Sequence, residues 1–353
     1  MPVQKQRDGL IDAIKAFAII CVVFAHCIEF GSGQRVLSKE LFFDDPLFEF
    51  ICSFHMPLFM LVSGYLFAFS IRKGSYASLL MKKVNTLIIP LFSWAVVEVG
   101  IYIVSCFLNK SGWPGFKELA LELLYRFLHH QWFLWAVFWC TLIVLTNKYL
   151  FKDSLVIYLA VFILTFFLPD GNNIALYSFM YPYFVIGYLI NREDTGKRES
   201  SLGQKWLLPV LLALFIALFL LYNRDSYVYT SGYSLIGEKS GILRQLGIDL
   251  YRLVIGLVGS VVIVLSIKAL YCHFPIGVKN VMSNIGMNTL GIYILSNLVF
   301  NDHFLRTFSI RLDGIHYGFV VLETIVVIVV TLLLTWIIKK IVFLNEILLG
   351  GRR

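Results

Sequence analysis

Apolar runs of membrane-spanning length recur along the whole chain, and they constrain its fold more than any other feature. A spanning α-helix needs about 20 mostly apolar residues. Runs of roughly this kind lie at 10–30, 47–70, 84–108, 131–149, 154–169, 174–191, 205–223, 249–271, 283–300 and 316–344. Hydrophobic residues make up 59% of the 353 residues and charged residues only 15%, unlike a soluble domain. We therefore expect an all-α integral membrane protein with about ten transmembrane helices.

The loops between these runs indicate one domain and a defined orientation. No loop is long enough for a separate soluble domain, so residues 1–353 are expected to form a single transmembrane domain. Lys and Arg concentrate on the side of both termini, above all in the segment 71–83, IRKGSYASLLMKK. Cytoplasmic loops carry such an excess, which predicts that both termini are cytoplasmic. The basic residues punctuate apolar runs instead of alternating with aromatic residues in a polar segment, so we expect membrane lipids and no nucleic acid as partners.

The first apolar run carries three ionisable residues, Asp12, Lys15 and His26. At about 100° per residue, the separation of Lys15 from His26 corresponds to about three full helical turns, so both side chains share a face with Asp12. Ionisable groups are costly in hydrocarbon, so this face is expected to look into a bundle and not into lipid. Lys15 and His26 are also about 16 Å apart along the helix axis, which predicts that they mark two depths of one cavity.

The second run carries His55 at a depth similar to that of His26. A neutral imidazole can take or give a proton near neutral pH, so two such residues in one pocket would suit the activation of a hydroxyl group. The alternative is that His55 is a core residue bonded to a backbone carbonyl near Pro57. Both interpretations stay open at this point.

Basic residues gather where the second and third runs approach the inner side, at Arg72, Lys82 and Lys83. Such clusters orient helices and contact anionic lipid. The same charges would also suit a phosphate-bearing donor that arrives from the cytosol. Cys and His residues show no spacing typical of a metal site, so no bound metal is expected.

Polar and aromatic residues also meet at the start of the fourth run, in His130, Gln131 and Trp132. This group fits the aromatic belt of a membrane interface, but Trp132 could instead stack on the apolar face of a sugar. Glu98 lies in the middle of the third run, where an unpaired carboxylate would be costly. It is therefore protonated, paired with a cation such as Lys15 or a His, or functional.

These residues resemble the membrane-bound acyltransferase 3 family over nearly the whole chain. The family's first helix carries an acidic residue, a basic residue three positions later and, after ten more residues, a His, as in Asp12, Lys15 and His26. The segment at 54–67, FHMPLFMLVSGYLF, is similar to the family's second helix and contains His55. Further similar segments are QWFLWAVF (131–138), MYPYFVIGYLI (180–190) and MNTLGIYILS (287–296). The chain departs from the family at Thr86, where a basic residue is usual, and at Ser296, where relatives often have His.

The resemblance implies a bacterial inner-membrane enzyme that O-acylates a glycan in polysaccharide biosynthesis. Acetyl-CoA would be the co-substrate, with no bound cofactor, and a cell-surface or lipid-linked sugar would be the acceptor. His26 would be the base or acyl carrier, assisted by Lys15, Asp12 and His55. Donor contacts would come from Lys15, Arg72, Lys82 and Lys83. Acceptor contacts would come from Trp132, His130, Gln131 and Glu98.

Two other functional classes remain compatible with the residues. A secondary transporter could use intramembrane ionisable groups as a proton relay while a substrate crosses the bundle. The relay residues would then be Asp12, Lys15, His26, His55 and Glu98. A non-catalytic scaffold in a polysaccharide-assembly complex would need none of them to react.

Overall fold

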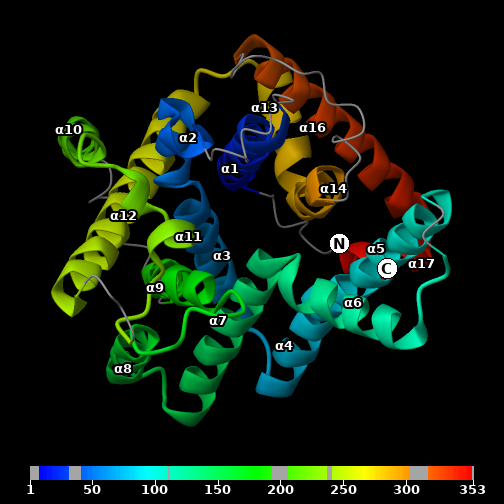
Figure 1. The fold of residues 1–353 in the computed structure, drawn as a ribbon. Helices are drawn as coiled ribbons and strands as arrows, with labels where there is room; N and C mark the ends of the chain where they lie inside the picture. Colours follow the sequence, from blue (N-terminus) through cyan, green and yellow to red (C-terminus); the bar gives the residue numbers. More distant parts are fainter. Residues whose placement is uncertain are drawn as a thin grey trace, which may run out of the picture.

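The computed structural model describes residues 8–31, 41–109, 112–192, 206–236, 241–301 and 317–351, and these residues form an all-helical structure (Figure 1). The helices are α1 (Gly9–His26), η1 (Cys27–Gly31), η3 (Leu41–Asp44), α2 (Pro46–Cys52), α3 (His55–Ile71), α4 (Tyr76–Lys83), η4 (Val84–Ile88), α5 (Ile89–Leu108), α6 (Phe116–His129), α7 (Trp132–Leu150), α8 (Leu155–Thr165), α9 (Ile174–Asn191), α10 (Leu207–Phe219), η6 (Arg224–Ser226), α11 (Val228–Ser231), α12 (Ile242–Tyr271), α13 (Ile276–Met287), α14 (Thr289–Asn301), α16 (Tyr317–Lys340) and α17 (Val342–Leu349).

All ten expected runs coincide with apolar helices. By length and composition, the seven candidate spans among the described residues are Gly9–Glu29, Pro46–Ile71, Tyr76–Leu108, Trp132–Leu150, Ile174–Asn191, Ile242–Tyr271 and Tyr317–Lys340. The other three runs are represented by the shorter apolar helices Leu155–Thr165, Leu207–Phe219 and Thr289–Val299. The all-α membrane architecture expected from the sequence is therefore confirmed.

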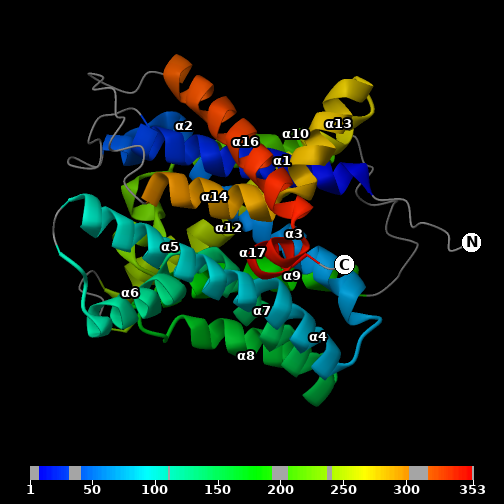
Figure 2. The same ribbon diagram turned by 90° about the vertical axis from the view of Figure 1, so that its right-hand side faces the viewer.

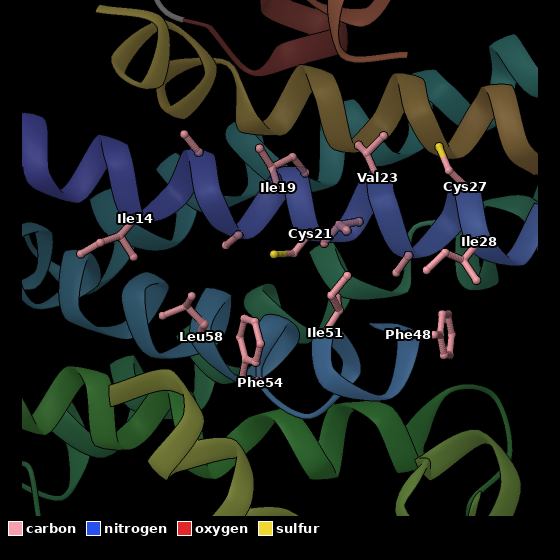
Figure 3. Packing of buried hydrophobic residues seen from close by; sticks show 14 of the residues in the cluster. Ile14, Ile19, Cys21, Val23, Cys27, Ile28, Phe48, Ile51, Phe54 and Leu58 are labelled. Atoms are coloured by element: carbon pink, nitrogen blue, oxygen red, sulfur yellow. The ribbon is translucent and has the colours of Figure 1, made fainter. Parts of the chain in front are cut away.

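Helix α1 lies at the centre of one half of the bundle, in contact with α3, α12, α13, α14 and α16 (Figure 1). Its residues Ile14, Ile19 and Val23 are at most 5% exposed, so other parts of the protein and not lipid cover them. Figure 3 shows its buried face above Phe54 and Leu58 of the second span. The sequence expectation that this helix faces a bundle and not lipid is met.

The second half of the bundle is organised by the contact between α3 and α9. Gly64 and Gly187 allow the two backbones to touch: a Cβ on Gly64 would collide with the carbonyl oxygen of Phe184, and one on Gly187 with that of Leu61. Small residues let membrane helices approach closely in this way. The pair therefore fixes the position of α3, whose first residue is His55.

Several of the expected runs are interrupted where the sequence predicted continuous helices, and three of these interruptions concern the first, second and ninth runs. The first changes to a π-helix at η1, and the second breaks between Cys52 and His55. Pro57 has no N–H group to offer the carbonyl of Ser53, which favours this break. The ninth expected run, 283–300, is also two helices, because α13 ends at Met287 and α14 begins at Thr289.

We call the end of the bundle where α1 begins the inner end, and the end where it finishes the outer end. The start of α1 and the terminal helix α17 both lie toward the inner end (Figure 2). Helix α17 is anchored to α5 by Trp94, whose Nε1 donates to the carbonyl of Leu348 at 2.8 Å. Helix α6 is a short amphipathic helix between the third and fourth runs.

Candidate active site

A cavity of about 1010 Å³ lies at the outer end of α1. This volume is at the upper end of the range that is usual for small-molecule sites. Side chains from eight parts of the fold border it: the end of α1 with η1, η3, α2 with the α2–α3 break, the α6–α7 turn, the first half of α9, the 222–230 segment, α12 and α14. Among the expected site residues, His26, His55, His130 and Trp132 line this cavity.

His26 is the last residue of α1, and it pairs with Glu29 in the π-helix η1. Its Nδ1 lies 3.2 Å from Oε2 of Glu29. A carboxylate can only accept, so Nδ1 carries the hydrogen and Nε2 keeps its lone pair. A carboxylate in this position also stabilises the imidazolium that forms when Nε2 takes a proton. Sequence reasoning missed Glu29, although its spacing of three residues from His26 was a usable signal.

His55 has the same tautomer for a different reason. It begins α3, and its Nδ1 lies 2.8 Å from the carbonyl oxygen of Ile51, which also can only accept. The side chain is therefore held by the backbone, as the structural interpretation expected, and still borders the cavity with Nε2 unprotonated in the neutral ring. The two interpretations of His55 left open by the sequence are compatible.

Lys15 and Asp12 lie apart from this cavity, which along α1 extends inward only to Val22. The Lys15 ammonium is 3.8 Å from Oδ1 of Asp12, and Asp12 is 3% exposed. The backbone of Asp12 lies directly against Gly286 of α13. The expectation that Lys15 and His26 border one cavity at two depths is therefore not met by this cavity.

The basic residues near the ends of α3 and α4 are also remote from the cavity. Arg72 donates to the side-chain oxygen of Asn191 at 3.2 Å and to its backbone carbonyl. The Lys83 ammonium lies 5.1 Å from the ring centroid of Phe67, and the Lys82 carbonyl accepts from Thr86. Arg72 and Lys83 are thus partly committed to contacts within the bundle.

Glu98 lies against a His and an Arg at the outer end. Its Oε2 lies 2.7 Å from Nδ1 of His130 and 3.6 Å from a terminal nitrogen of Arg126. Pairing with a His was one of the three states predicted for Glu98, and Arg126 was missed. Glu98 itself is 3% exposed and does not line the cavity, whereas its partner His130 does. Gln131 is 2% exposed, also lies off the cavity, and finds no hydrogen-bond partner in the described part of the chain.

The turn that carries His129 and His130 is held by asparagine side chains. Asn297 of α14 donates to the carbonyl of His130 at 2.9 Å, and Asn173 donates to that of His129 at 3.2 Å. The Oδ1 of Asn172 also lies 3.1 Å from Nε2 of His129. These bonds bring α9 and α14 together at the turn. Asn297 thus links α14 to the turn by a hydrogen bond, a common role of Asn in membrane helices.

Comparison with known proteins identifies the family. The acyltransferase domain family matches residues 8–340. The chain belongs to this acyltransferase family. With its several apolar helices it is a multi-pass membrane protein, and the resemblance noted in its sequence is confirmed.

Two relatives are both named nodulation protein NolL. The one from Mesorhizobium japonicum is 27% identical over 237 residues, which cover 66% of this chain and 61% of the relative. The one from Sinorhizobium fredii is 28% identical over 235 residues, which cover 64% and 60%. The match thus spans about three fifths of the length of these curated relatives. No solved structure matches significantly.

Proposed function

We propose that this protein is a membrane O-acyltransferase of the bacterial inner membrane. It moves an acetyl group from cytosolic acetyl-CoA to a sugar hydroxyl of a cell-surface or lipid-linked glycan at the outer face. The observation that carries the proposal is the His26–Glu29 pair, with the Nδ1 to Oε2 distance of 3.2 Å, at the wall of a large cavity in a chain of this family.

His26 acts as the base in this mechanism. Nε2 removes the proton of the acceptor hydroxyl as its oxygen attacks the thioester carbonyl, and Glu29 stabilises the resulting imidazolium. The tetrahedral intermediate then expels the thiolate of coenzyme A, which takes the proton from Nε2. The products are an O-acetyl sugar and the free thiol of coenzyme A. In the alternative route, Nε2 first accepts the acetyl group and then passes it to the hydroxyl.

The donor enters from the inner end in this proposal. Arg72, Lys82 and Lys83 lie near the inner ends of α3 and α4, where they would meet the phosphates of the coenzyme. Lys15, oriented by Asp12, lies on α1 between that end and His26, and would stabilise negative charge along the path of the donor. On the acceptor side, Trp132 and His130 border the cavity and would contact the sugar, while Glu98 supports His130.

The distribution of the polar residues favours this proposal over proton-coupled transport. Of the residues that a transporter would use as a relay, His26 and His55 line the cavity, whereas Asp12, Lys15 and Glu98 do not. A proton relay needs groups linked through one polar path.

The test uses inverted membrane vesicles, which expose the cytosolic face. Vesicles with acetyl-labelled acetyl-CoA outside and glycan acceptor inside are compared for the wild type, His26→Ala and His273→Ala. His273 is an exposed His in the turn after α12, away from the cavity, so it is a matched control. We expect label in the glycan fraction of the wild type and of His273→Ala, and none for His26→Ala. Full labelling by His26→Ala would overturn the assignment of the base.

A further inference from the structure

One wall of the cavity is formed by a segment with little regular structure. We call residues 222–236, between α10 and α12, the outer segment. It contains only the short helices η6 and α11. Its cavity-lining residues are Tyr222, Arg224, Ser226, Tyr227, Val228, Tyr229 and Thr230. Helices this short are not stable by themselves, so other parts of the fold must fix the shape of this wall.

Arg252 of α12 provides the main attachment of this segment. Its side chain is 1% exposed and donates to the carbonyls of Ser226 at 3.0 Å and Gly232 at 2.6 Å. It also donates to the carbonyls of Asp225 at 2.7 Å and Tyr227 at 2.9 Å, and to the hydroxyl of Ser231. The planar guanidinium thus organises main-chain oxygens from both halves of the segment around one centre.

The charge of Arg252 is balanced within the same helix. Oδ1 of Asp249 lies 2.7 Å from one of its terminal nitrogens. Gln245 donates to Asp249 at 3.2 Å and to the carbonyl of Gly232 at 3.2 Å. All three side chains are at most 2% exposed, so the group is a buried, hydrogen-bonded network and not a surface ion pair.

Further contacts hold the flanks of the segment. Asp170 accepts from the backbone N–H of Tyr233 at 3.1 Å and of Ser234 at 2.8 Å. The Tyr227 hydroxyl donates to the carbonyl of Phe43 at 3.1 Å. Between these attachments, Tyr229 borders the cavity with 66% of its surface exposed. An accessible aromatic side chain on an anchored stretch of backbone therefore stands at the cavity wall, with Trp132 as another lining aromatic residue from α7.

We propose that the outer segment is an acceptor subsite for sugars beyond the one that reacts, with Tyr229 as the contact and Arg252 as its positioning residue. This inference rests on the proposed function. The acceptor is then an oligosaccharide: the reacting sugar lies at His26, and a neighbouring sugar places its apolar face on Tyr229. The cavity volume of about 1010 Å³ exceeds what one sugar ring needs, which supports an acceptor of several units.

The experiment uses the glycan that becomes labelled in the vesicle assay. Mild base removes its acyl esters, partial acid hydrolysis cleaves it, and sizing yields a monosaccharide and a tetrasaccharide fraction as acceptors. KM and kcat for each fraction are measured with purified protein and acetyl-CoA. For the wild type we expect a KM for the tetrasaccharide that is lower by about tenfold or more, because aromatic contacts of this kind dominate recognition.

The variants separate contact from positioning. Tyr229→Ala should raise the tetrasaccharide KM about tenfold and abolish the preference for the tetrasaccharide over the monosaccharide. Tyr229→Phe should keep this preference. Arg252→Lys keeps the charge opposite Asp249 but loses the planar fork, so it should raise the same KM. It should also make the outer segment more sensitive to protease added to sealed right-side-out vesicles, which expose the outer face. Tyr149→Ala, on α7 away from the cavity, is the matched control and should retain the preference.

The failure of this inference is distinguishable from the failure of the proposed function. If wild-type vesicles place no label in glycan, the proposed function fails. If label is transferred but the tetrasaccharide has no advantage, or Tyr229→Ala lowers kcat equally for both fractions, the subsite is wrong and the enzyme assignment stands. If Arg252→Lys leaves KM and protease sensitivity at wild-type values, Arg252 is not the positioning residue.

Discussion

Glu98 and His130 form a second carboxylate–imidazole contact at the outer end, with Oε2 2.7 Å from Nδ1. It resembles the contact of Glu29 with His26, but the surroundings of the two carboxylates differ. Glu98 is 3% exposed and also faces Arg126, whereas the side chain of Glu29 is 21% exposed and belongs to the cavity wall. We therefore expect Glu98 to serve mainly stability and Glu29 mainly catalysis.

Replacement of Glu98 should destabilise the protein. Glu98→Gln removes the buried charge that faces both Arg126 and His130, and breaking a buried pair costs about 3 kcal/mol in the free energy of unfolding. Glu122 also binds Arg126, through Nε at 2.8 Å, but it is more exposed. Glu122→Gln is the matched control and should cost less than about 1 kcal/mol. Unfolding of the detergent-solubilised variants measures both changes in free energy. Equal losses for Glu98→Gln and Glu122→Gln would contradict the larger structural role of Glu98.

Replacement of Glu29 should slow the reaction without unfolding the protein. Glu29→Gln can still accept from Nδ1 of His26 but cannot stabilise the imidazolium charge, so we expect kcat to fall about 10- to 100-fold with little change in acceptor KM. Glu29→Asp should retain part of the activity. Rates of acetyl transfer to glycan provide the measurement. Wild-type kcat in Glu29→Gln would show that His26 works without this carboxylate.

His55→Asn tests whether His55 takes part in chemistry. The amide nitrogen of Asn can occupy the place of Nδ1 and donate to the Ile51 carbonyl, but nothing replaces Nε2. We expect the melting temperature to stay near that of the wild type while kcat falls about tenfold or more. A variant that is stable and fully active would assign His55 to packing alone. His55→Ala, which loses both atoms, provides the comparison.

Lys15 should affect the donor and not the acceptor. Because it lies inward of the cavity, Lys15→Gln is expected to raise the KM for acetyl-CoA several-fold while the acceptor KM stays within about twofold. Initial rates at varied concentrations of each substrate give the KM for acetyl-CoA and the acceptor KM separately. A change confined to the acceptor KM would contradict the assignment of Lys15 to the donor.

The glycine contact between α3 and α9 should be sensitive to a single methyl group. Gly64→Ala places a Cβ against the carbonyl of Phe184, so we expect a loss of about 1–3 kcal/mol in the free energy of unfolding. Gly100 of α5 has no neighbouring atom within 4 Å of a built Cβ among the described residues. Gly100→Ala is thus the control, and it should be neutral or slightly stabilising. Equal melting temperatures for the two variants would show that the helices can move apart.

Local patterns in the sequence predicted the helices and part of the site. Apolar length located the spans, and helical periodicity together with the family motifs singled out His26 and His55. The π-helix at Cys27–Gly31 and the break before His55 were not predictable, because both replace one helical hydrogen-bond pattern with another inside an apolar run. Pro57 was the only local signal for the break.

Contacts between distant segments could not be predicted from one chain. Arg252 lies near the start of the expected run 249–271, and nothing in its neighbours reveals that it binds carbonyls some 20 to 27 residues earlier in the chain. For Glu98, the sequence predicted pairing with a cation such as Lys15 or a His, but it did not single out His130. The contact with Arg126 and the Asn297 bond to the turn depend on how α5, α6 and α14 pack.

The attachment of the outer segment through Arg252 has a consequence for how relatives can diverge. Four of the acceptors that Arg252 binds are main-chain oxygens, which are present whatever side chains follow them. The path of the segment is thus specified separately from the side chain that it presents at Tyr229. Under the proposed function, substitution at that position is expected to change which glycan is accepted while the wall that carries it stays in place. New acceptor preferences would then evolve by single amino-acid changes on an unchanged scaffold.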